Sequence, residues 1–293
     1  MNKIVVEVGS TCTKIDKYDG SKIEHLDTVT IQFKKNYSKE NKLNENDVNQ
    51  LINVVNDLKD ISSDIYVCGT SIFRSLDNNQ RKEFLDYFKQ KTEYDFDIIS
   101  QEKENELTVL GTVRNINQRV AIFIGGGGST EIAIYDNGIK EMVNSKIGVI
   151  DIMNKYPDLG EDLATTELST VKEYIKDKLN YPQGKADILI LAGGGHEKFA
   201  RGSGITYEKN ILFNDESQPI MMNIENRIKD TKRYYKEISL DNIRNNEKDP
   251  AWWYATRAMS AFVLDVADII EAKYIVPTDI SMVYGILNNM SEK

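Results

Sequence analysis

The sequence predicts an α/β protein built from two related halves, and three observations support this prediction. Apolar, strand-like runs alternate with stretches of helical periodicity along the 293 residues, which is the pattern of an α/β fold. A strand-rich segment occurs twice, at 3–31 and again at 120–148. A hydrophobic content of 40% with 28% charged residues is typical of a globular chain that buries a core.

The strands are expected where β-branched and apolar residues run between turn residues. In chain order these runs are 3–8, 22–33, 64–70, 95–100, 119–125, 130–136, 139–148, 187–195 and 273–277. The helices are expected where apolar residues recur every three or four positions. These stretches are 45–59, 78–91, 102–114, 149–156, 161–179, 221–236, 249–272 and 279–290.

The repeated segment has the same order of elements in both copies. Each copy is a strand, a glycine-containing turn that ends in Ser-Thr, a second strand, an Asp-Gly or Asn-Gly turn and a third strand. Asp-Gly and Asn-Gly pairs between strands are strong signals of short hairpins. We therefore predict a first domain of 1–117, joined by a C-terminal helix at about 279–293, and a second domain of 118–278.

Composition excludes several classes of protein. A net charge of −9 argues against a nucleic-acid-binding surface, which is normally basic. The segment AMSAFVLDVADIIEA is interrupted by Asp265 and Asp268, so it predicts a core helix and no membrane span. Cys12 and Cys68 lack metal-binding spacing and are expected to be small buried residues. The N-terminus lacks a signal-peptide pattern, so a cytoplasmic location is expected, and a homodimer is left open.

Three glycine-rich turns follow predicted strands. Consecutive backbone N–H groups in such turns form concave anion sites, and loops from two related halves could hold a phosphate chain between them. The proposed donors are Gly9, Ser10, Thr11, Gly126, Gly127, Gly128, Ser129, Thr130, Gly193, Gly194 and Gly195. For the third turn, close packing of a strand on a helix is an equal alternative. His196, which follows it, could contact a ligand or belong to the fold.

Five short segments, in this order along the chain, resemble the exopolyphosphatase/guanosine pentaphosphate phosphatase (Ppx/GppA) family of the actin-like superfamily. They are EVGSTCTK at 7–14, GTSIFRSLDN at 69–78, IISQEKENELTVLG at 98–111, FIGGGGSTE at 123–131 and VPTDISMVYGIL at 276–287. The resemblance implies two actin-like (ribonuclease H-like) domains, each with a mixed β-sheet and flanking helices, around a central cleft.

The resemblance also implies an activity. Members of the family release terminal phosphate from inorganic polyphosphate or guanosine pentaphosphate with Mg²⁺. In this type of reaction, a carboxylate orients and deprotonates water while cations and N–H groups stabilise charge on the phosphate oxygens. The expected partner is therefore a polyanionic phosphate substrate.

Four further site residues are implied by position in the family motifs. Glu104 matches the catalytic glutamate, Arg74 a phosphate-binding arginine, and Glu7 and Glu131 the carboxylates of the metal site. Each has an ordinary structural alternative. Glu104 could be a helix first-turn acid, Glu131 an exposed strand acid, and Arg74 a surface arginine at a helix start.

The chain departs from the family at one metal position. The family has an aspartate two residues before its glycine run, and here that position is Phe123, or Ile124 if the extra glycine is accommodated differently. A phosphate-binding protein with impaired catalysis is therefore the first alternative. A nucleotide-dependent ATPase or kinase is the second, because GSTCTK also resembles iron–sulfur activator ATPases. Those proteins need cluster cysteines, for which Cys12 and Cys68 lack a suitable context.

Overall fold

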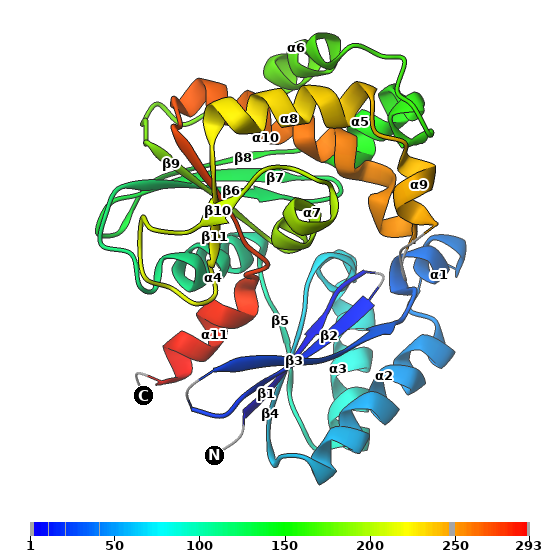
Figure 1. Ribbon diagram of the computed structural model, residues 1–293. Coiled ribbons are helices and arrows are strands. Elements are labelled where there is room, and N and C mark those ends of the chain that lie inside the picture. The colour runs from blue at the N-terminus through cyan, green and yellow to red at the C-terminus, as the bar shows by residue number, and fades with distance from the viewer. Residues whose placement is uncertain (1–2, 11, 21, 41, 246–249, 292–293) are drawn as a thin grey trace. The chain divides into compact units, whose positions relative to one another are not determined.

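The computed structural model describes residues 3–291 apart from 11, 21, 41 and 246–249. Contacts within the chain divide it into two compact units (Figure 1). The first lobe is Met1–Leu107 with Ile286–Lys293, and the second lobe is Thr108–Gly285. The division falls inside helix α4 (Gln101–Val113), whereas the predicted boundary near residue 118 follows that helix. The bounds predicted for the two domains, 1–117 and 118–278, therefore remain a prediction.

A mixed sheet forms the centre of the first lobe. Among the described residues its order is β3 (Ile23–Thr30), β2 (Cys12–Tyr18), β1 (Lys3–Val8), β4 (Asp64–Gly69) and β5 (Phe96–Ile98). The first three strands are antiparallel, and β4 and β5 add in parallel. This arrangement confirms the predicted strand–turn–strand–turn–strand unit at the start of the chain.

Helices α2 (Glu45–Asp57) and α3 (Asn78–Thr92) lie side by side in the first lobe (Figure 1). Asn44 caps α2 by accepting backbone N–H groups, and Asp77 with Gln80 forms a capping box on α3, which satisfies N–H groups left free at a helix start. The shorter helices are α1 (Phe33–Glu40), η1 (Leu58–Asp60) and η2 (Ser71–Ser75). The core beneath them contains contacting phenylalanine rings, namely Phe33, Phe73, Phe84, Phe88 and Phe96.

The sheet of the second lobe repeats this topology and extends it. Its described order is β8 (Ile139–Ser145), β7 (Thr130–Tyr135), β6 (Val120–Gly125), β9 (Ile188–Ala192), β12 (Tyr274–Pro277), β11 (Ile220–Asn223) and β10 (Glu208–Lys209). The order β8-β7-β6-β9-β12 corresponds to β3-β2-β1-β4-β5, with antiparallel and parallel pairs at the same places. The fold is therefore α/β with two mixed sheets, as predicted.

Helices α5 (Val149–Lys155), α6 (Leu168–Lys178), α8 (Ile224–Lys236) and α10 (Thr256–Ile270) gather on one side of this sheet (Figure 1). Helix α10 is almost entirely buried, which confirms the predicted core helix. Its Asp265 accepts a hydrogen bond from Tyr181, and burial raises the pKa of this carboxyl. No described helix is long and apolar enough to cross a membrane. The remaining elements are η3 (Pro157–Gly160), α7 (His196–Gly202), α9 (Leu240–Arg244), η4 (Pro250–Ala255) and α11 (Met282–Ser291).

Several predicted helices begin later than expected, and two of them show the physical reason. The stretch 221–236 opens as strand, because β11 pairs with β12, and α8 begins only after Asn223 accepts the Glu225 N–H. The stretch 161–179 becomes helical at Leu168. Before that point Asp158 accepts hydrogen bonds from the two threonines of the Thr165–Thr166 turn, and such local side-chain bonds compete with helix formation.

Candidate functional site

The first glycine hairpin joins β1 to β2. The Gly9 N–H donates to the Cys12 carbonyl at 2.9 Å, and a Cβ at Gly9 would lie 3.0 Å from that oxygen, so a larger residue would crowd the turn. The Ser10 hydroxyl donates to the Ser71 hydroxyl at 2.7 Å. This contact ties the hairpin to η2, which carries Arg74. The predicted donor Thr11 lies outside the described residues.

Arg74 and Glu104 form an ion pair in the first lobe. Arg74 Nη1 lies 2.7 Å from Glu104 Oε2, and the two side chains are 24% and 27% exposed. Arg74 also donates to the Ile99 carbonyl and to Gln101 Oε1. Because several acceptors fix the guanidinium, the Glu104 carboxylate is held in one place while both groups remain open to solvent.

Glu102 differs from Glu104 although both lie in the first turn of α4. Glu102 is exposed, and hydrogen bonds from its own backbone N–H and from Ser100 lower its pKa. These are the properties of an ordinary first-turn acid. Glu104 instead pairs with Arg74, so the structure brings together two of the residues that the sequence singled out.

Lys14 is a site residue that the sequence reasoning missed. It lies directly across from Glu7 in the β1–β2 register. Its pKa is raised, chiefly by the Glu7 carboxylate and further by other acids that include Glu104. The hairpin indicates this pair only once its register is known, because residues that face each other across a two-stranded turn share one face of the sheet. The first lobe therefore gathers Glu7, Lys14, Arg74 and Glu104 around its hairpin.

Both cysteines are free thiols, but only Cys68 is buried as predicted, whereas Cys12 is partly exposed. Cys68 on β4 is adjacent to Glu7 in the parallel register and fully buried. Burial, followed by the Glu7 charge, raises the pKa of its thiol. A neutral buried thiol is a poor nucleophile, so Cys68 belongs to the fold.

The second glycine hairpin joins β6 to β7 and is closed like the first. The Gly126 N–H donates to the Ser129 carbonyl at 2.9 Å. The Thr130 hydroxyl is buried and donates to the Ile147 carbonyl at 2.7 Å, so its hydrogen is used within the lobe. Of the proposed second-hairpin donors, the backbone N–H groups of Gly127 and Gly128 belong to exposed residues.

The four-glycine run packs its backbone against the start of α5. The N–H groups of Val149 and Ile150 donate to the carbonyls of Gly126 and Gly127. A Cβ at Gly148 would lie only 2.4 Å from the Gly127 carbonyl carbon. None of the run has a positive φ, and a Cβ at Gly128 would meet nothing within 4 Å. The fold thus explains a small residue at Gly148 but gives no steric reason for glycine at 128.

Glu131 lies on β7 directly across from Ile124 on β6. It is only 3% exposed, so the alternative of an exposed strand acid is wrong. Ile124 and Glu131 share one face of the sheet, whereas Phe123 points to the other face, into the core beneath α10. An aspartate able to act beside Glu131 would therefore have to replace Ile124 and not Phe123.

The third glycine turn follows β9. Gly193, Gly194 and Gly195 have φ values of 100°, 105° and 81°, a conformation that only glycine adopts without strain. A Cβ at Gly195 would also lie 2.6 Å from the Trp252 ring, so close packing contributes as well. His196, the next residue, is buried, and burial with the nearby Arg227 charge lowers its pKa to about 4.

The hairpins offer few ligands for a metal ion. Among the residues that the structure describes, no group of three or more His, Cys, Asp or Glu side chains could hold one. The first hairpin offers Glu7, which faces Lys14, and the second offers Glu131, which faces Ile124.

Comparisons with known proteins agree with this fold. No curated protein matches the chain. A Ppx/GppA family member from Aquifex aeolicus is 18% identical, with a TM-score of 0.80 over 100% of this chain and 99% of that one. An exopolyphosphatase from Cytophaga hutchinsonii is 14% identical, with a TM-score of 0.73 over 100% and 98%. Nucleoside triphosphate hydrolases from Neospora caninum are 9% identical, with a TM-score of 0.61 over 100% and 92%.

The first two structures establish that each lobe has the actin-like fold that the sequence motifs implied. A model of the Ppx/GppA phosphatase family also matches residues 15–233, which is most of the chain and includes Arg74, Glu104 and the second glycine hairpin. The chain therefore belongs to the Ppx/GppA phosphatase family.

Proposed function

We propose that this protein releases terminal phosphate from inorganic polyphosphate or guanosine pentaphosphate. Membership of a phosphatase family supports phosphohydrolase chemistry in general. The observation that carries the finer proposal is the Arg74–Glu104 ion pair, which η2 connects to the first glycine hairpin through the Ser10–Ser71 bond. A carboxylate, two cations and hairpin N–H groups within one lobe are the groups that phosphoryl transfer to water needs.

In the first lobe, Glu104 acts as general base. The carboxylate orients water and accepts its proton as the water oxygen attacks the terminal phosphorus, while the phosphoanhydride oxygen leaves with the shortened chain. Arg74 holds Glu104 and turns its guanidinium toward phosphate oxygens. Lys14 supplies a second cation beside the hairpin, and the backbone N–H of Ser10 binds a phosphate oxygen, while the Gly9 N–H keeps its bond to the Cys12 carbonyl and closes the turn.

In the second lobe, the N–H groups of Gly127, Gly128 and Ser129 and of the Gly194–Gly195 turn bind phosphate oxygens, while the Gly126 N–H keeps its bond to the Ser129 carbonyl. Glu7 in the first lobe and Glu131 in the second would each offer carboxylate oxygens to Mg²⁺, an ion that often takes only one or two protein carboxylates and completes its shell with water and substrate phosphate. When bound, Mg²⁺ would neutralise charge on the phosphate chain. The Thr130 hydroxyl keeps its hydrogen bond to the Ile147 carbonyl and so stabilises the turn.

A second candidate is a phosphate-binding protein with impaired catalysis. The side chain beside Glu131 is Ile124, which cannot bind a metal ion. Lys14 faces Glu7, and a cation there competes with Mg²⁺ for the same carboxylate. Both hairpins keep their backbone donors in this case, so the protein would bind the polyanion without turning it over.

Phosphate release from long-chain polyphosphate and from guanosine pentaphosphate, with Mg²⁺ and with chelator, separates the two candidates. We expect metal-dependent release that Glu104→Gln lowers by about 10²–10⁴-fold, the usual range for losing a general base. The matched control is Glu102→Gln, an exposed acid on the same helix turn, which should stay near wild type. Tight binding of either polyanion without release would establish the second candidate. Neither binding nor release would overturn both.

A further inference from the structure

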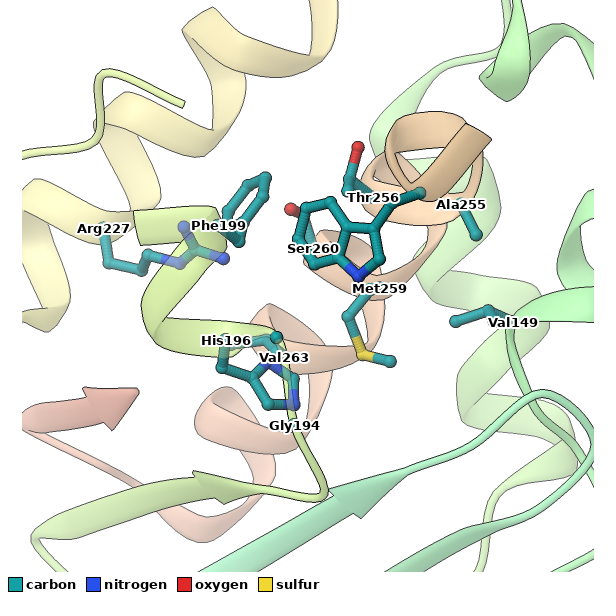
Figure 2. A pocket seen from close by; sticks show the side chains of 12 residues that line it. Val149, Gly194, His196, Phe199, Arg227, Ala255, Thr256, Met259, Ser260 and Val263 are labelled. Atoms are coloured by element: carbon teal, nitrogen blue, oxygen red, sulfur yellow. The ribbon is translucent and has the colours of Figure 1, made fainter. Parts of the chain in front are cut away.

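A cavity of about 160 Å³ lies within the second lobe, between the third glycine turn, α7, α8 and α10. Figure 2 shows its lining side chains. Phe199, Trp252, Met259 and Val263 make most of its wall apolar. An engineered apolar cavity of about 150 Å³ holds a benzene molecule, so this cavity has room for a ligand about one ring in size.

Arg227 of α8 lines the cavity and is only 2% exposed. Its Nε and Nη1 atoms are buried and have no hydrogen-bond acceptor among the described residues. Figure 2 shows its guanidinium directed toward Phe199, and the guanidinium carbon lies 5.2 Å from that ring centroid. A cation–π contact offsets part of the cost of burying a charge, but it does not satisfy the N–H groups.

The guanidinium also forms no ion pair within the part of the chain that the structure describes. Asp230, one turn along α8, attracts it, yet that carboxylate accepts the Thr206 N–H at 2.8 Å. Burial lowers the Arg227 pKa to about 10, so the group is still charged at neutral pH. A buried charge without a partner is costly, and each buried N–H without an acceptor adds to that cost.

Two neighbours define what else the cavity offers. Ser260 of α10 lines it, is 1% exposed, and its hydroxyl has no partner among the described residues. His196 lines it too, but its pKa of about 4 keeps it neutral at pH 7. The cavity therefore has one positive charge, one free hydroxyl and apolar walls.

We propose that this cavity is a binding site for a small organic carboxylate, with the carboxylate on Arg227 and Ser260 and an apolar body of about one ring against Trp252 and Met259. A carboxylate supplies the acceptor oxygens that the guanidinium lacks. Inorganic phosphate would satisfy Arg227 but leave the apolar walls uncovered, and a neutral ring would leave the charge unpaired. The walls and the charge together select a molecule that has both parts.

The occupant would lie against Gly194 and Gly195, which also line the cavity. These residues belong to the turn whose N–H groups the proposed function assigns to phosphate. The carboxylate site does not depend on that assignment, because its observations are the cavity and the unpaired Arg227 and Ser260.

The test uses benzoate as the probe and benzamide, of the same shape but neutral, as its matched control. Binding to the purified full-length chain is followed by calorimetry and by tryptophan fluorescence, since Trp252 lines the cavity. We expect benzoate to bind at least about tenfold more tightly than benzamide, as a charge-assisted contact to arginine implies. Arg227→Met should abolish that preference, and Ser260→Ala should weaken benzoate binding about two- to tenfold.

Lys229→Met is the matched control, because Lys229 is an exposed cation on the same helix, and it should leave benzoate binding unchanged. Equal binding of benzoate and benzamide, or no binding of benzoate at millimolar concentration, would overturn the proposal. Displacement of benzoate by equimolar inorganic phosphate would overturn the part of the proposal that requires an organic carboxylate with an apolar body. If Arg227→Met fails to fold, the wild-type ratio of the two probes with Ser260→Ala still decides. Phosphate hydrolysis plays no part in this measurement.

Discussion

The two glycine hairpins are closed by equivalent backbone hydrogen bonds but differ in the side chains beside them. Each is closed by an N–H to carbonyl bond of 2.9 Å across the turn, from Gly9 to Cys12 and from Gly126 to Ser129. One step outside the turn, the cross-strand pair is Glu7 with Lys14 in the first lobe and Ile124 with Glu131 in the second. The duplicated fold thus preserves the turn, while acids and cations at equivalent positions have diverged.

The segments that follow the first parallel strand of each sheet, β4 and β9, also differ in their charged residues. After β4 the first lobe presents Arg74, whose partner Glu104 is also partly exposed. After β9 the second lobe buries His196, and Arg227 beside it is buried as well. The charged groups next to these segments are therefore partly exposed in the first lobe and buried in the second. We infer that the first lobe supplies the reactive groups and the second mainly backbone donors.

The largest expected effect comes from placing aspartate at the two positions before the second turn. Phe123→Asp removes a fully buried ring and places a carboxylate in the core, so we expect a loss of roughly 4 kcal/mol or more in the free energy of unfolding. Ile124→Asp should cost less, because Ile124 is half-buried beside Glu131. Urea unfolding followed by fluorescence reports the second lobe, which contains both tryptophans.

Ile124→Asp also tests whether the missing acid limits activity. We expect Mg²⁺-dependent phosphate release to rise at least about tenfold, because a second carboxylate beside Glu131 completes a pair that Mg²⁺ can use. A folded Ile124→Asp variant with unchanged release would contradict this. If Phe123→Asp were the more stable of the two, the equivalence of Glu7 with Ile124 in the two hairpins would be wrong.

Local signals explain what the sequence could predict. The turns at Asp19-Gly20 and Asn137-Gly138 contain residues with positive φ, so each hairpin could be predicted from one dipeptide. Glu104 and Arg74 were found through short motifs, and the structure brings them together. By contrast, 221–223 has the periodicity of a helix start and becomes a strand only because β12 lies beside it, a contact between residues far apart in the sequence.

The missed and undecided parts of the site required strand register. Lys14 became evident only when the β1–β2 pairing placed it across from Glu7. The choice between Phe123 and Ile124 could not be made from the motif, because adjacent strand residues face opposite sides of a sheet. The cavity around Arg227 combines segments from 149 to 263, and no local pattern identifies such a combination.

Acid should destabilise the second lobe through His196. Its pKa in the fold is about 4, below the ordinary value of 6.5, so the fold favours the neutral ring and protonation favours unfolding. Stability from this residue is fully present above pH 6.5 and is lost as the pH falls toward 4, by up to about 3 kcal/mol. Fluorescence-monitored urea unfolding between pH 7 and 4 measures this loss.

His196→Gln is the comparison for that titration, because it cannot be protonated while carboxylates titrate equally in both proteins. The difference in unfolding free energy between wild type and variant should shrink with falling pH. A constant difference would show that His196 is not kept neutral by burial. The contrast between buried groups in the second lobe and the partly exposed Arg74–Glu104 pair in the first would then weaken.

Lys14 tests the charged pair of the first hairpin. Lys14→Met removes a cation beside Glu7, so we expect phosphate release to fall about 10–100-fold, the range for losing a charge-assisted hydrogen bond. Lys14→Arg should retain most of the activity, and Lys17→Met, on the same strand, should change little. Equal losses at Lys14 and Lys17 would point to general electrostatic attraction of the polyanion.

The smallest effect on stability is expected at Gly128, and a substitution there distinguishes the second turn from the first. A Cβ there meets nothing within 4 Å, whereas a Cβ at Gly9 would lie 3.0 Å from the Cys12 carbonyl oxygen. Gly128→Ala should therefore change the free energy of unfolding by no more than about 0.5–1 kcal/mol, and could raise it by restricting the unfolded chain. If the exposed turn receives phosphate, the added methyl group stands where the substrate approaches, and the KM for polyphosphate rises while stability holds. Gly9→Ala should lower stability and activity together, because crowding moves the turn itself. A Gly128→Ala variant with wild-type KM would mean that substrate does not approach this turn, and the second hairpin would then resemble the first in backbone alone.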